Sequence, residues 1–339
     1  MHTSKLSQIS LMEVCGTHTM AIAKFGIRQL LPKNVRLLSG PGCPVCVTSN
    51  NSIDKMIALA KMPGVTVATF GDMMRVPGST SSLIEEKAKG AKVEVVYSPL
   101  DALELATQTK DEVVFLGVGF ETTAPTSAAT IIRASEMGLN NFSIFCAHKN
   151  MPGALELIVN DPKLKVDGLI LPGHVSTITG LKPYEFLAKK YKIPGVVSGF
   201  EAEDILLAIK MLTNQIEKGD AKIENAYPRG VKDEGNPTAL KLIDEVFDTC
   251  DATWRGLGNI EGSGYKIRKR YKAFNAEEKF NIKEEPTQEN KACKCGDVLK
   301  GIISPQDCPL FKKVCTPQNP VGPCMVSSEG SCSAHYKYL

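Results

Sequence analysis

Short apolar runs alternate with longer stretches of helical spacing from about residue 35 to residue 210. The helical stretches place apolar residues three or four positions apart with charges between them, as in Ser52–Lys61, Ala124–Met137 and Ala202–Leu212. Buried strands joined by amphipathic helices form βαβ units, which assemble into largely parallel sheets. The apolar runs that we predict as strands are Val35–Leu38, Val65–Phe70, Val93–Tyr97, Val113–Leu116, Phe142–Phe145, Gly168–Leu171 and Gly195–Val197.

The pattern changes after about residue 225. Arg255–Gly264 is rich in glycine, Lys266–Lys272 is basic, and Ala276–Lys291 is charged with few large apolar residues. These features predict loops or linkers. From Cys293 onward the chain combines cysteines with proline and glycine and shows little helical periodicity. Such a segment is typical of a domain organised around a metal rather than an apolar core.

The predicted fold class is α/β, with two similar parallel-sheet halves followed by an irregular C-terminal iron–sulfur domain. A short repeat supports two similar halves, because Gly119–Glu121 and Gly199–Glu201 have the same Gly-Phe-Glu sequence between a predicted strand and a predicted helix. The approximate domain boundaries that we predict are 1–110, 111–225 and 226–339.

Charge and hydropathy exclude several classes of partner. The 40 Lys and Arg residues nearly balance the 37 Asp and Glu residues, and the formal charge of +3 is too small for an electrostatic footprint on nucleic acid or anionic membrane. The first ten residues lack the apolar core of a secretion signal, and no apolar run approaches the roughly 20 residues that cross a bilayer. We therefore expect a cytoplasmic protein with no nucleic-acid or membrane partner.

Eleven cysteines in a cytoplasmic protein are not a disulfide scaffold, because cytosolic thiols stay reduced unless a bond is catalytic or transient. Three cysteines lie in Cys15–Cys46 and six in Cys293–Cys332, whereas Cys146 and Cys250 stand apart. The thiols are thus divided between two separate sites.

The first site contains a C-x-x-C pair within Gly40–Cys46, directly after a predicted strand and before a predicted helix. At a strand-to-helix turn, Cys43 and Cys46 would lie near a helix N-terminus, where the positive end of the dipole favours thiolate. Thiolate is the form that binds soft metals or attacks a disulfide. The alternative is an ordinary pair of buried cysteines, which this spacing disfavours.

A third thiol, Cys15, lies in the sequence Cys-Gly-Thr-His-Thr before a predicted helix, Met20–Leu31. His18 in this motif could supply an acid–base group or a hydrogen bond behind the thiols. It could equally cap a helix or pack in a core. The motif matters because it belongs to the same predicted α/β half as the C-x-x-C pair.

Three further polar loops follow predicted strands: Gly117–Thr123, Cys146–Asn150 and Gly173–Ser176. In α/β sheets, ligands bind at the carboxyl ends of strands, so these loops could line a cleft shared with the cysteines. Capping and turn formation explain them equally well. No phosphate-binding G-x-x-x-x-G-K-[ST] sequence is present, which disfavours nucleotide chemistry.

The second site is the C-terminal group of six thiols. Four irregularly spaced cysteines in a loop suit a [4Fe–4S] cluster, whereas structural zinc usually has two C-x-x-C pairs, which this segment lacks. The two remaining thiols could form a neighbouring redox pair. We assign the cluster to Cys308, Cys315, Cys324 and Cys332, and the possible redox pair to Cys293 and Cys295.

Taken together and in order, these motifs resemble those of the HypD family of hydrogenase maturation factors, over essentially the whole chain. The motifs that carry the resemblance are Cys15-Gly-Thr-His-Thr, Gly40-Pro-Gly-Cys-Pro-Val-Cys46, Gly119-Phe-Glu-Thr-Thr-Ala-Pro125, Pro172-Gly-His-Val-Ser176, Cys308-Pro-Leu-Phe and Gly322-Pro-Cys-Met-Val-Ser-Ser-Glu-Gly-Ser-Cys332.

The resemblance implies a scaffold, rather than a turnover enzyme, that assembles the Fe(CN)₂CO unit of [NiFe]-hydrogenase. A small HypC-type chaperone would be its partner, and a HypE-type protein would supply cyanide. It also implies that Cys15, Cys43 and Cys46 handle this second iron, which carries cyanide and CO. The tail cysteines would hold the cluster and relay electrons to a disulfide, as in ferredoxin:thioredoxin reductase.

An alternative function is an iron–sulfur-dependent thiol–disulfide reductase that acts through Cys43 and Cys46. Iron that retains infrared bands of cyanide and CO would favour the scaffold, whereas turnover of protein disulfides without such iron would favour the reductase. A purely structural adaptor is disfavoured by the number of thiols.

Overall fold

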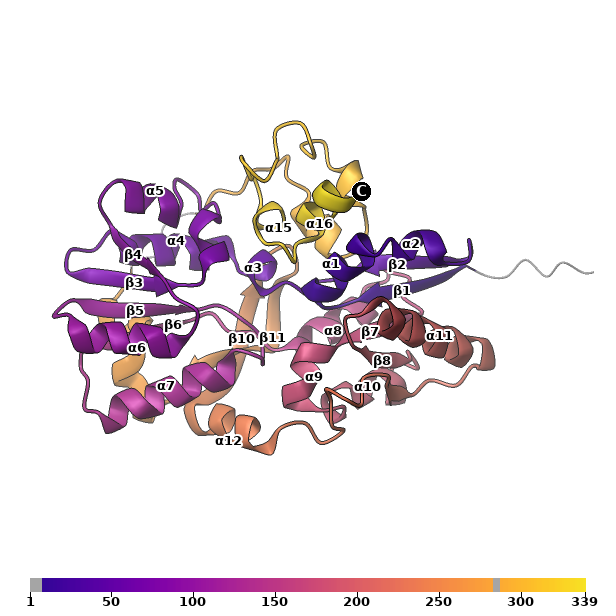
Figure 1. Cartoon of the computed structure of the whole chain (residues 1–339), viewed down its shortest axis with the longest axis horizontal. Coiled ribbons are helices and arrows are strands. Elements are labelled where there is room, and N and C mark those ends of the chain that lie inside the picture. The colour runs from indigo at the N-terminus through magenta and orange to yellow at the C-terminus, as the bar shows by residue number, and fades with distance from the viewer. Residues whose placement is uncertain (1–7, 283–286) are drawn as a thin grey trace, which may run out of the picture.

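The computed structural model describes residues 8–282 and 287–339 and contains two parallel β-sheets (Figure 1). One sheet has five strands in the order β2-β1-β7-β8-β9, and the other has four in the order β4-β3-β5-β6. All seven predicted strands are confirmed. The strands are β1 (Ile9–Glu13), β2 (Val35–Ser39), β3 (Val65–Thr69), β4 (Lys92–Val95), β5 (Glu112–Gly117), β6 (Phe142–Cys146), β7 (Gly168–Pro172), β8 (Gly195–Ser198) and β9 (Ile223–Asn225).

Helices pack against both sheets, and several begin at caps that the sequence supplies. Ser82 and Ser98 form capping boxes at the starts of α5 and α6, which satisfies otherwise unpaired N–H groups. In the α/β part the helices are α1 (Gly16–Lys24), α2 (Ile27–Leu30), α3 (Pro44–Val47), α4 (Asn50–Ala60), η1 (Gly71–Arg75), α5 (Leu83–Ala88), α6 (Pro99–Gln108), α7 (Ala124–Glu136), α8 (Met151–Asn160), α9 (Gly173–Thr179), η2 (Lys182–Tyr184), α10 (Glu185–Lys189) and α11 (Ala202–Lys218).

Sheet membership does not follow the predicted boundary at residue 110. The five-stranded unit takes β1 and β2 from the start of the chain and β7 to β9 from much later, while β3 to β6 form the four-stranded unit. β1 is the reason, because it pairs with β2 through Ile9–Glu13 and with β7 through Leu11–Glu13. The whole four-stranded sheet is therefore inserted in the sequence between β2 and β7 of the five-stranded sheet.

The helix predicted over Met20–Leu31 is wrong in its bounds. α1 starts earlier, at Gly16, and ends at Lys24, and a separate short helix, α2, follows. Gly26 separates the two with φ of 63°, a left-handed conformation that glycine adopts without steric cost.

The loop predicted over Arg255–Gly264 is in fact part of an antiparallel hairpin, β10 (Phe247–Trp254) and β11 (Gly258–Ile267). The fully buried Trp254 anchors it by stacking on Phe120, with ring centroids 5.7 Å apart. Isolated β-bridges also join the hairpin to the α/β part of the chain: Trp254 pairs with Thr48, and Gly264 pairs with Lys149. The surrounding helices are α12 (Pro237–Val246), η3 (Lys269–Phe274) and α13 (Ala276–Phe280).

The C-terminal segment is a small irregular layer, which lies above the junction of the two units in Figure 1. Its short helix α15 packs against α3, and α16 packs against α1. Five of its six cysteines are buried, so thiols make up much of its interior. Its helices are α14 (Cys295–Leu299), η4 (Pro305–Asp307), α15 (Pro323–Val326) and α16 (Ser331–Tyr338).

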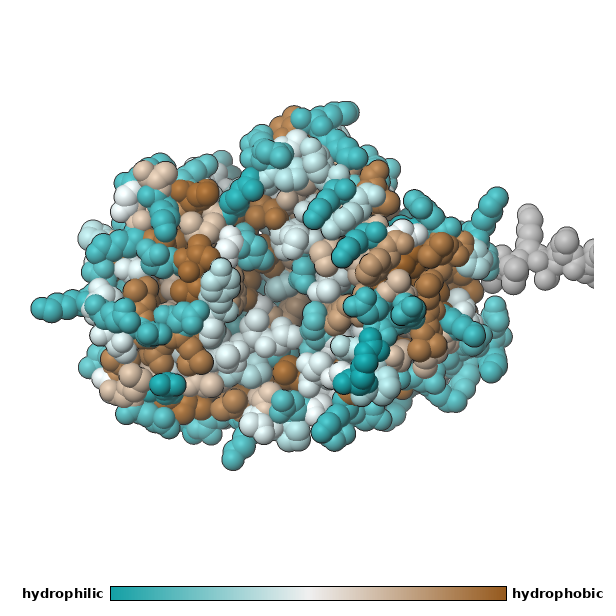
Figure 2. Space-filling view, viewed as in Figure 1, coloured by the Kyte–Doolittle hydropathy of each residue, from teal (hydrophilic) through white to brown (hydrophobic). Residues whose placement is uncertain are grey.

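The surface is a mixture of hydrophilic and hydrophobic residues, and the face shown in Figure 2 is hollowed between the two units. Large exposed apolar side chains such as Leu30 and Val314 come from separate parts of the chain. Throughout the described ranges, no helix combines the length and apolar character needed to cross a bilayer.

Candidate metal centre

Cys15 lies just beyond the carboxyl end of β1, as the N-cap of α1. Its backbone N–H donates to the Glu13 carboxylate at 3.3 Å, and Thr19 donates to the other oxygen of that carboxylate at 2.6 Å. Glu13 is fully buried inside the strand, and burial raises the pKa of its carboxyl to about 8. A buried acid therefore fixes the backbone that carries the first thiol.

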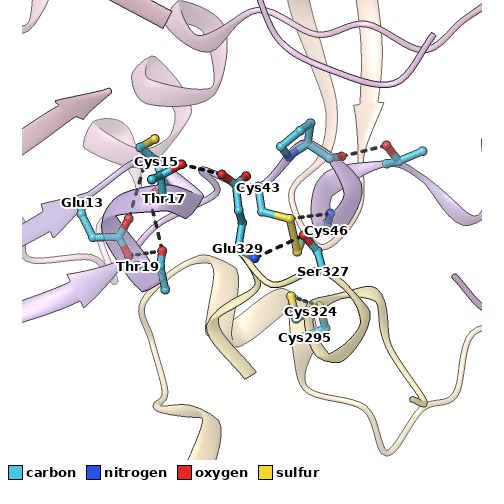
Figure 3. The surroundings of a disulfide bond; sticks show 12 residues. Glu13, Cys15, Thr17, Thr19, Cys43, Cys46, Cys295, Cys324, Ser327 and Glu329 are labelled. Atoms are coloured by element: carbon cyan, nitrogen blue, oxygen red, sulfur yellow. Dashed lines mark hydrogen bonds between the residues drawn. A yellow bond between two sulfur atoms is a disulfide. The ribbon is translucent and has the colours of Figure 1, made fainter. Parts of the chain in front are cut away.

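The Gly40–Cys46 loop follows β2, the neighbour of β1, so both thiol motifs begin at one edge of the sheet. The Gly16 N–H donates to the Gly42 carbonyl at 2.9 Å. A Cβ at Gly42 would lie only 2.3 Å from the Cys15 backbone nitrogen, so glycine is required for this approach. A backbone contact therefore holds the Cys15 motif against the C-x-x-C loop, and in Figure 3 the Glu329 side chain lies between Cys15 and Cys43.

Cys43 and Cys46 form a disulfide across the start of α3. Their Cα atoms are 5.3 Å apart, within the usual range for a disulfide. Cys43 is the N-cap of α3, and its sulfur accepts the Cys46 N–H at 3.2 Å. The exposed fractions are 3% for Cys43 and 0% for Cys46, so both residues are buried while the disulfide is closed.

The Cys15 thiol has no disulfide partner and is buried. Burial raises its pKa to about 12, and the nearby Glu329 carboxylate adds to this shift. The thiol therefore keeps its proton near neutral pH until a cation takes that proton's place, as metal ions do at thiolate sites.

Glu329 comes from the C-terminal segment and reaches over the start of α1, as Figure 3 shows. The Thr17 hydroxyl donates to its carboxylate at 2.5 Å. Burial raises the pKa of Glu329 above its ordinary value. A Cβ on Gly16 would lie 2.4 Å from the Glu329 Cβ, which shows how tightly the two segments pack. The tail is therefore part of the surroundings of Cys15.

The tail thiols lie close to one another. The sulfur atoms of Cys295 and Cys324 are 2.7 Å apart. Burial raises the pKa of Cys332 well above its ordinary value, and four other thiols add to that shift, which places them all within electrostatic reach: Cys293, Cys295, Cys308 and Cys315. Cys295 thus lies beside Cys324, predicted as a cluster ligand, and it also interacts with Cys293, its predicted redox partner, because each of these two thiols shifts the pKa of the other.

The tail offers an all-thiol donor set, which is the set that iron–sulfur clusters use. In residues 8–282 and 287–339, no three His, Cys, Asp or Glu side chains meet at a point suited to a single metal ion. Cluster ligands bind different iron atoms, so they need to surround a larger volume than the ligands of one ion. The donor chemistry fits a cluster.

His18 lies on α1, and its ring forms hydrogen bonds with the loop after β8 rather than with the thiols. Its Nε2 donates to the carbonyl of Gly199 at 2.9 Å, and the ring lies 5.0 Å from that of Phe200. Burial lowers its pKa to about 4, so the ring is neutral at neutral pH. Within the described part of the chain its Nδ1 has no hydrogen-bond partner.

Sequence reasoning missed two acidic residues of this site. Glu13 could have been found, because it is a carboxylate at the end of an otherwise apolar strand segment, Leu11–Glu13. No local sequence pattern indicated Glu329, because its hydrogen bond with Thr17 joins residues 312 positions apart in the sequence. A contact of that range depends on the docking of the tail.

Comparisons with known proteins give a consistent result over the full length. The HypD family model, described as "Hydrogenase formation hypA family", matches residues 1–339. A putative hydrogenase expression/formation protein of Methanocaldococcus jannaschii is 48% identical over 98% of this chain and 93% of its own length.

Two bacterial relatives agree with this result. Hydrogenase maturation factor HypD of Rhizobium leguminosarum bv. viciae is 47% identical over 96% of this chain and 87% of its own length. The HypD of Cupriavidus necator is 45% identical over 97% of this chain and 89% of its own length.

Proposed function

This chain belongs to the HypD family of hydrogenase maturation factors, and from this membership we propose that it is the scaffold on which the hydrogenase iron receives its cyanide and CO ligands. A HypC-type chaperone is the proposed partner, and a HypE-type protein the proposed source of cyanide. The iron is cargo that is handed on, so the protein acts as a redox-active assembly scaffold rather than a turnover enzyme.

The observation that carries the proposal is the close backbone approach of the Cys15 motif to the C-x-x-C loop at Gly42. Soft thiolates suit low-valent iron, and two thiolates alone leave such an ion poorly held. A third thiol from Cys15, together with a thiol of the partner, completes a soft donor set. Burial of all three sulfurs keeps the site away from water and oxidants.

The disulfide must open before Cys43 and Cys46 can bind iron. We assign this step to the Cys295 and Cys324 pair, and the assignment is supported by α15, which carries Cys324 and packs against α3. Two thiols of the tail would give two electrons and two protons to the disulfide, which becomes two thiols while the tail pair becomes a disulfide. Figure 3 shows the two pairs on facing segments.

This role revises the proposed division of the tail thiols. With Cys295 and Cys324 as the redox pair, four thiols are left for the [4Fe–4S] cluster. The cluster supplies single electrons at low potential when it is bound. The proposed ligands are Cys293, Cys308, Cys315 and Cys332, in place of the set that included Cys324.

The thiol–disulfide reductase is the second candidate, because the C-x-x-C pair is a disulfide here. A reductase of proteins needs an attacking sulfur that its substrate can reach. Cys46 is fully buried and Cys43 nearly so, so a substrate protein does not reach either sulfur in this oxidised state.

Anaerobic co-purification with the HypC-type partner separates the two functions. The scaffold predicts infrared bands of iron-bound cyanide and CO in the complex, and no turnover of a protein disulfide above the rate of a free dithiol. Catalytic turnover of such a disulfide by protein that carries no cyanide or CO bands would support the reductase instead.

A further inference from the structure

A cavity of about 480 Å³ lies between strand β2 and the C-terminal segment. β2 is an edge strand of its sheet, and all five of its residues line one wall together with Arg28 of α2. Residues 303–306 and His335 line the wall on the side of the C-terminal segment. Among the described residues no cysteine lines the cavity, so it is separate from both thiol sites.

The charged side chains that line this cavity are all cations. They are Arg28, Lys33 and Arg36, and no Asp or Glu side chain of the described ranges lines it. Within residues 8–282 and 287–339, none of the three forms an ion pair, either with an acidic side chain or with the carboxylate of Leu339. A concave site with one sign of charge and no internal counter-ion attracts an anion.

Arg28 is the most buried of these cations, because the other two are exposed. Its guanidinium donates to the Leu37 carbonyl and lies 3.5 Å from the Ser39 hydroxyl, which is a weak contact. Its Nε is buried and has no hydrogen-bond partner in the part of the chain that the structure describes. The donors of this side chain are therefore only partly used.

The nearby acid does not neutralise Arg28. Burial lowers the pKa of the Arg28 guanidinium, and the charge of Glu13 opposes that shift. Burial also raises the pKa of Glu13 to about 8, however, so at neutral pH this carboxyl is mostly protonated. A guanidinium that has lost water and has no charged partner is costly, and a bound anion would relieve that cost.

The lining residues indicate the class of anion. Guanidinium groups donate in a fork that matches the oxygens of carboxylate and phosphate, and three cations favour a ligand with more than one negative charge. A phosphate monoester carries roughly 1.5 to 2 negative charges at neutral pH, whereas a carboxylate carries a single charge. Apolar side chains line the cavity beside the cations, among them Leu31, Val298 and Ile303, and these suit an organic body attached to the phosphate.

We propose that this cavity binds the phosphate group of an organic phosphate monoester, with Arg28 and Arg36 donating to its oxygens and Lys33 adding charge. The ligand lies between the edge strand and the C-terminal segment, so its binding stabilises the docking of that segment on the five-stranded sheet. The site does not depend on the proposed function, because no described cysteine lines the cavity.

Isothermal titration calorimetry of the anaerobically purified full chain tests the class of ligand, with phenyl phosphate, inorganic phosphate and benzoate as probes. We expect saturable binding of phenyl phosphate, and affinity for benzoate weaker on the order of 10-fold, because benzoate carries less charge. Inorganic phosphate that binds as tightly as phenyl phosphate would identify free phosphate as the ligand of the same site. No saturable binding of either phosphate, or benzoate binding as tight as that of phenyl phosphate, would overturn the proposal.

Variants locate the binding in this cavity. Arg36→Gln changes an exposed side chain and should weaken phenyl phosphate binding on the order of 10-fold, with a larger loss in Arg28→Gln. Arg133→Gln is the matched control, because Arg133 is an exposed arginine on α7 outside the cavity, and it should bind as the wild type does. Circular dichroism verifies folding, and Arg36→Gln decides the matter if Arg28→Gln does not fold.

Amide hydrogen exchange supplies a second readout. Phenyl phosphate should slow the exchange of residues 298–306 in the wild type and in Arg133→Gln, and much less in Arg36→Gln. Wild-type affinity in folded Arg36→Gln would overturn the site. Binding that leaves the exchange of residues 298–306 unchanged would overturn the proposed link between the ligand and the docking of the C-terminal segment.

Discussion

The two thiol regions of this protein are built in opposite ways. Cys15, Cys43 and Cys46 lie at the ends of two paired parallel strands, and an apolar sheet frame sets their positions. The tail holds six cysteines on short helices and turns, and five of them are buried. A metal site on a frame keeps its geometry without metal, whereas a segment whose interior is largely thiol depends on the metal for its stability.

Specific contacts join the two regions. The Glu329 carboxylate reaches Thr17 on α1, and α15 packs against α3. Through these contacts the state of the tail can influence the thiols on the frame. Changes within each region should therefore have different consequences, and changes at the contacts should affect both.

The largest expected effect is local unfolding of the tail after loss of one cluster thiol. In Cys308→Ala, amide hydrogen exchange of residues 293–339 should accelerate on the order of 100-fold, equivalent to about 3 kcal/mol, while the strands stay protected. Cys250→Ala on the hairpin is the control and should leave the tail protected. Unchanged tail protection in Cys308→Ala would show that the tail does not need its metal.

A second variant disrupts the close approach between the Gly42 loop and Cys15. Gly42→Ala places a Cβ 2.3 Å from backbone atoms of Cys15, and backbone cannot move aside as a flexible side chain can. We expect a loss of about 3 kcal/mol in the free energy of unfolding, measured with denaturant. Gly71→Ala, whose Cβ would lie 3.6 Å from Val95, should cost less than about 1 kcal/mol. Equal stabilities for the two variants would contradict the close approach.

We also expect the free energy of unfolding to depend on pH through His148, which follows β6. Burial lowers the pKa of His148 from 6.5 to about 4, so the folded state keeps the ring neutral while the unfolded state takes up a proton. Stability from this group is present above about pH 6.5 and is lost as the pH falls toward 4, by about 2 kcal/mol at pH 5. Denaturant titrations at several pH values should show a weaker acid dependence in His148→Gln. Parallel curves for wild type and variant would be inconsistent with a neutral buried ring.

The smallest expected effect lies at the contact between the regions. A double-mutant cycle with Thr17→Val and Glu329→Gln should give a coupling energy of about 1 kcal/mol, because the hydroxyl donates to a partly buried carboxylate at 2.5 Å. Additive effects would mean that the tail and α1 do not communicate through this bond.

The sequence predicted strands well where apolar runs are continuous, as in Val65–Phe70 and Gly168–Leu171. It missed β1, where Ser10 and Glu13 interrupt the run, and the hairpin, where glycine and charged residues hide a strand. Which sheet each strand joins was also out of reach, because β1 pairs with β7 across about 150 residues and no local pattern records such pairings.

The kinds of residue at the site could be predicted from the sequence, but which thiols lie next to each other could not. The spacing of Cys43 and Cys46 at a strand-to-helix turn predicted two thiols at a helix start, and the structure has Cys43 as the cap of α3. The approach of Cys295 to Cys324 depends on how the tail folds back, so spacing indicated only Cys293 and not this second neighbour of Cys295. Close packing of distant segments is the information that the sequence pattern lacks.

The central claim is that the frame thiols bind the iron cargo while the tail thiols hold a separate cluster. The most direct measurement is to purify Cys15→Ala, Cys43→Ala and Cys46→Ala anaerobically with the HypC-type partner, and to record the infrared spectrum and the visible cluster absorption of each. We expect loss of the cyanide and CO bands with the cluster absorption unchanged. Cyanide and CO bands of wild-type intensity in all three variants would contradict it.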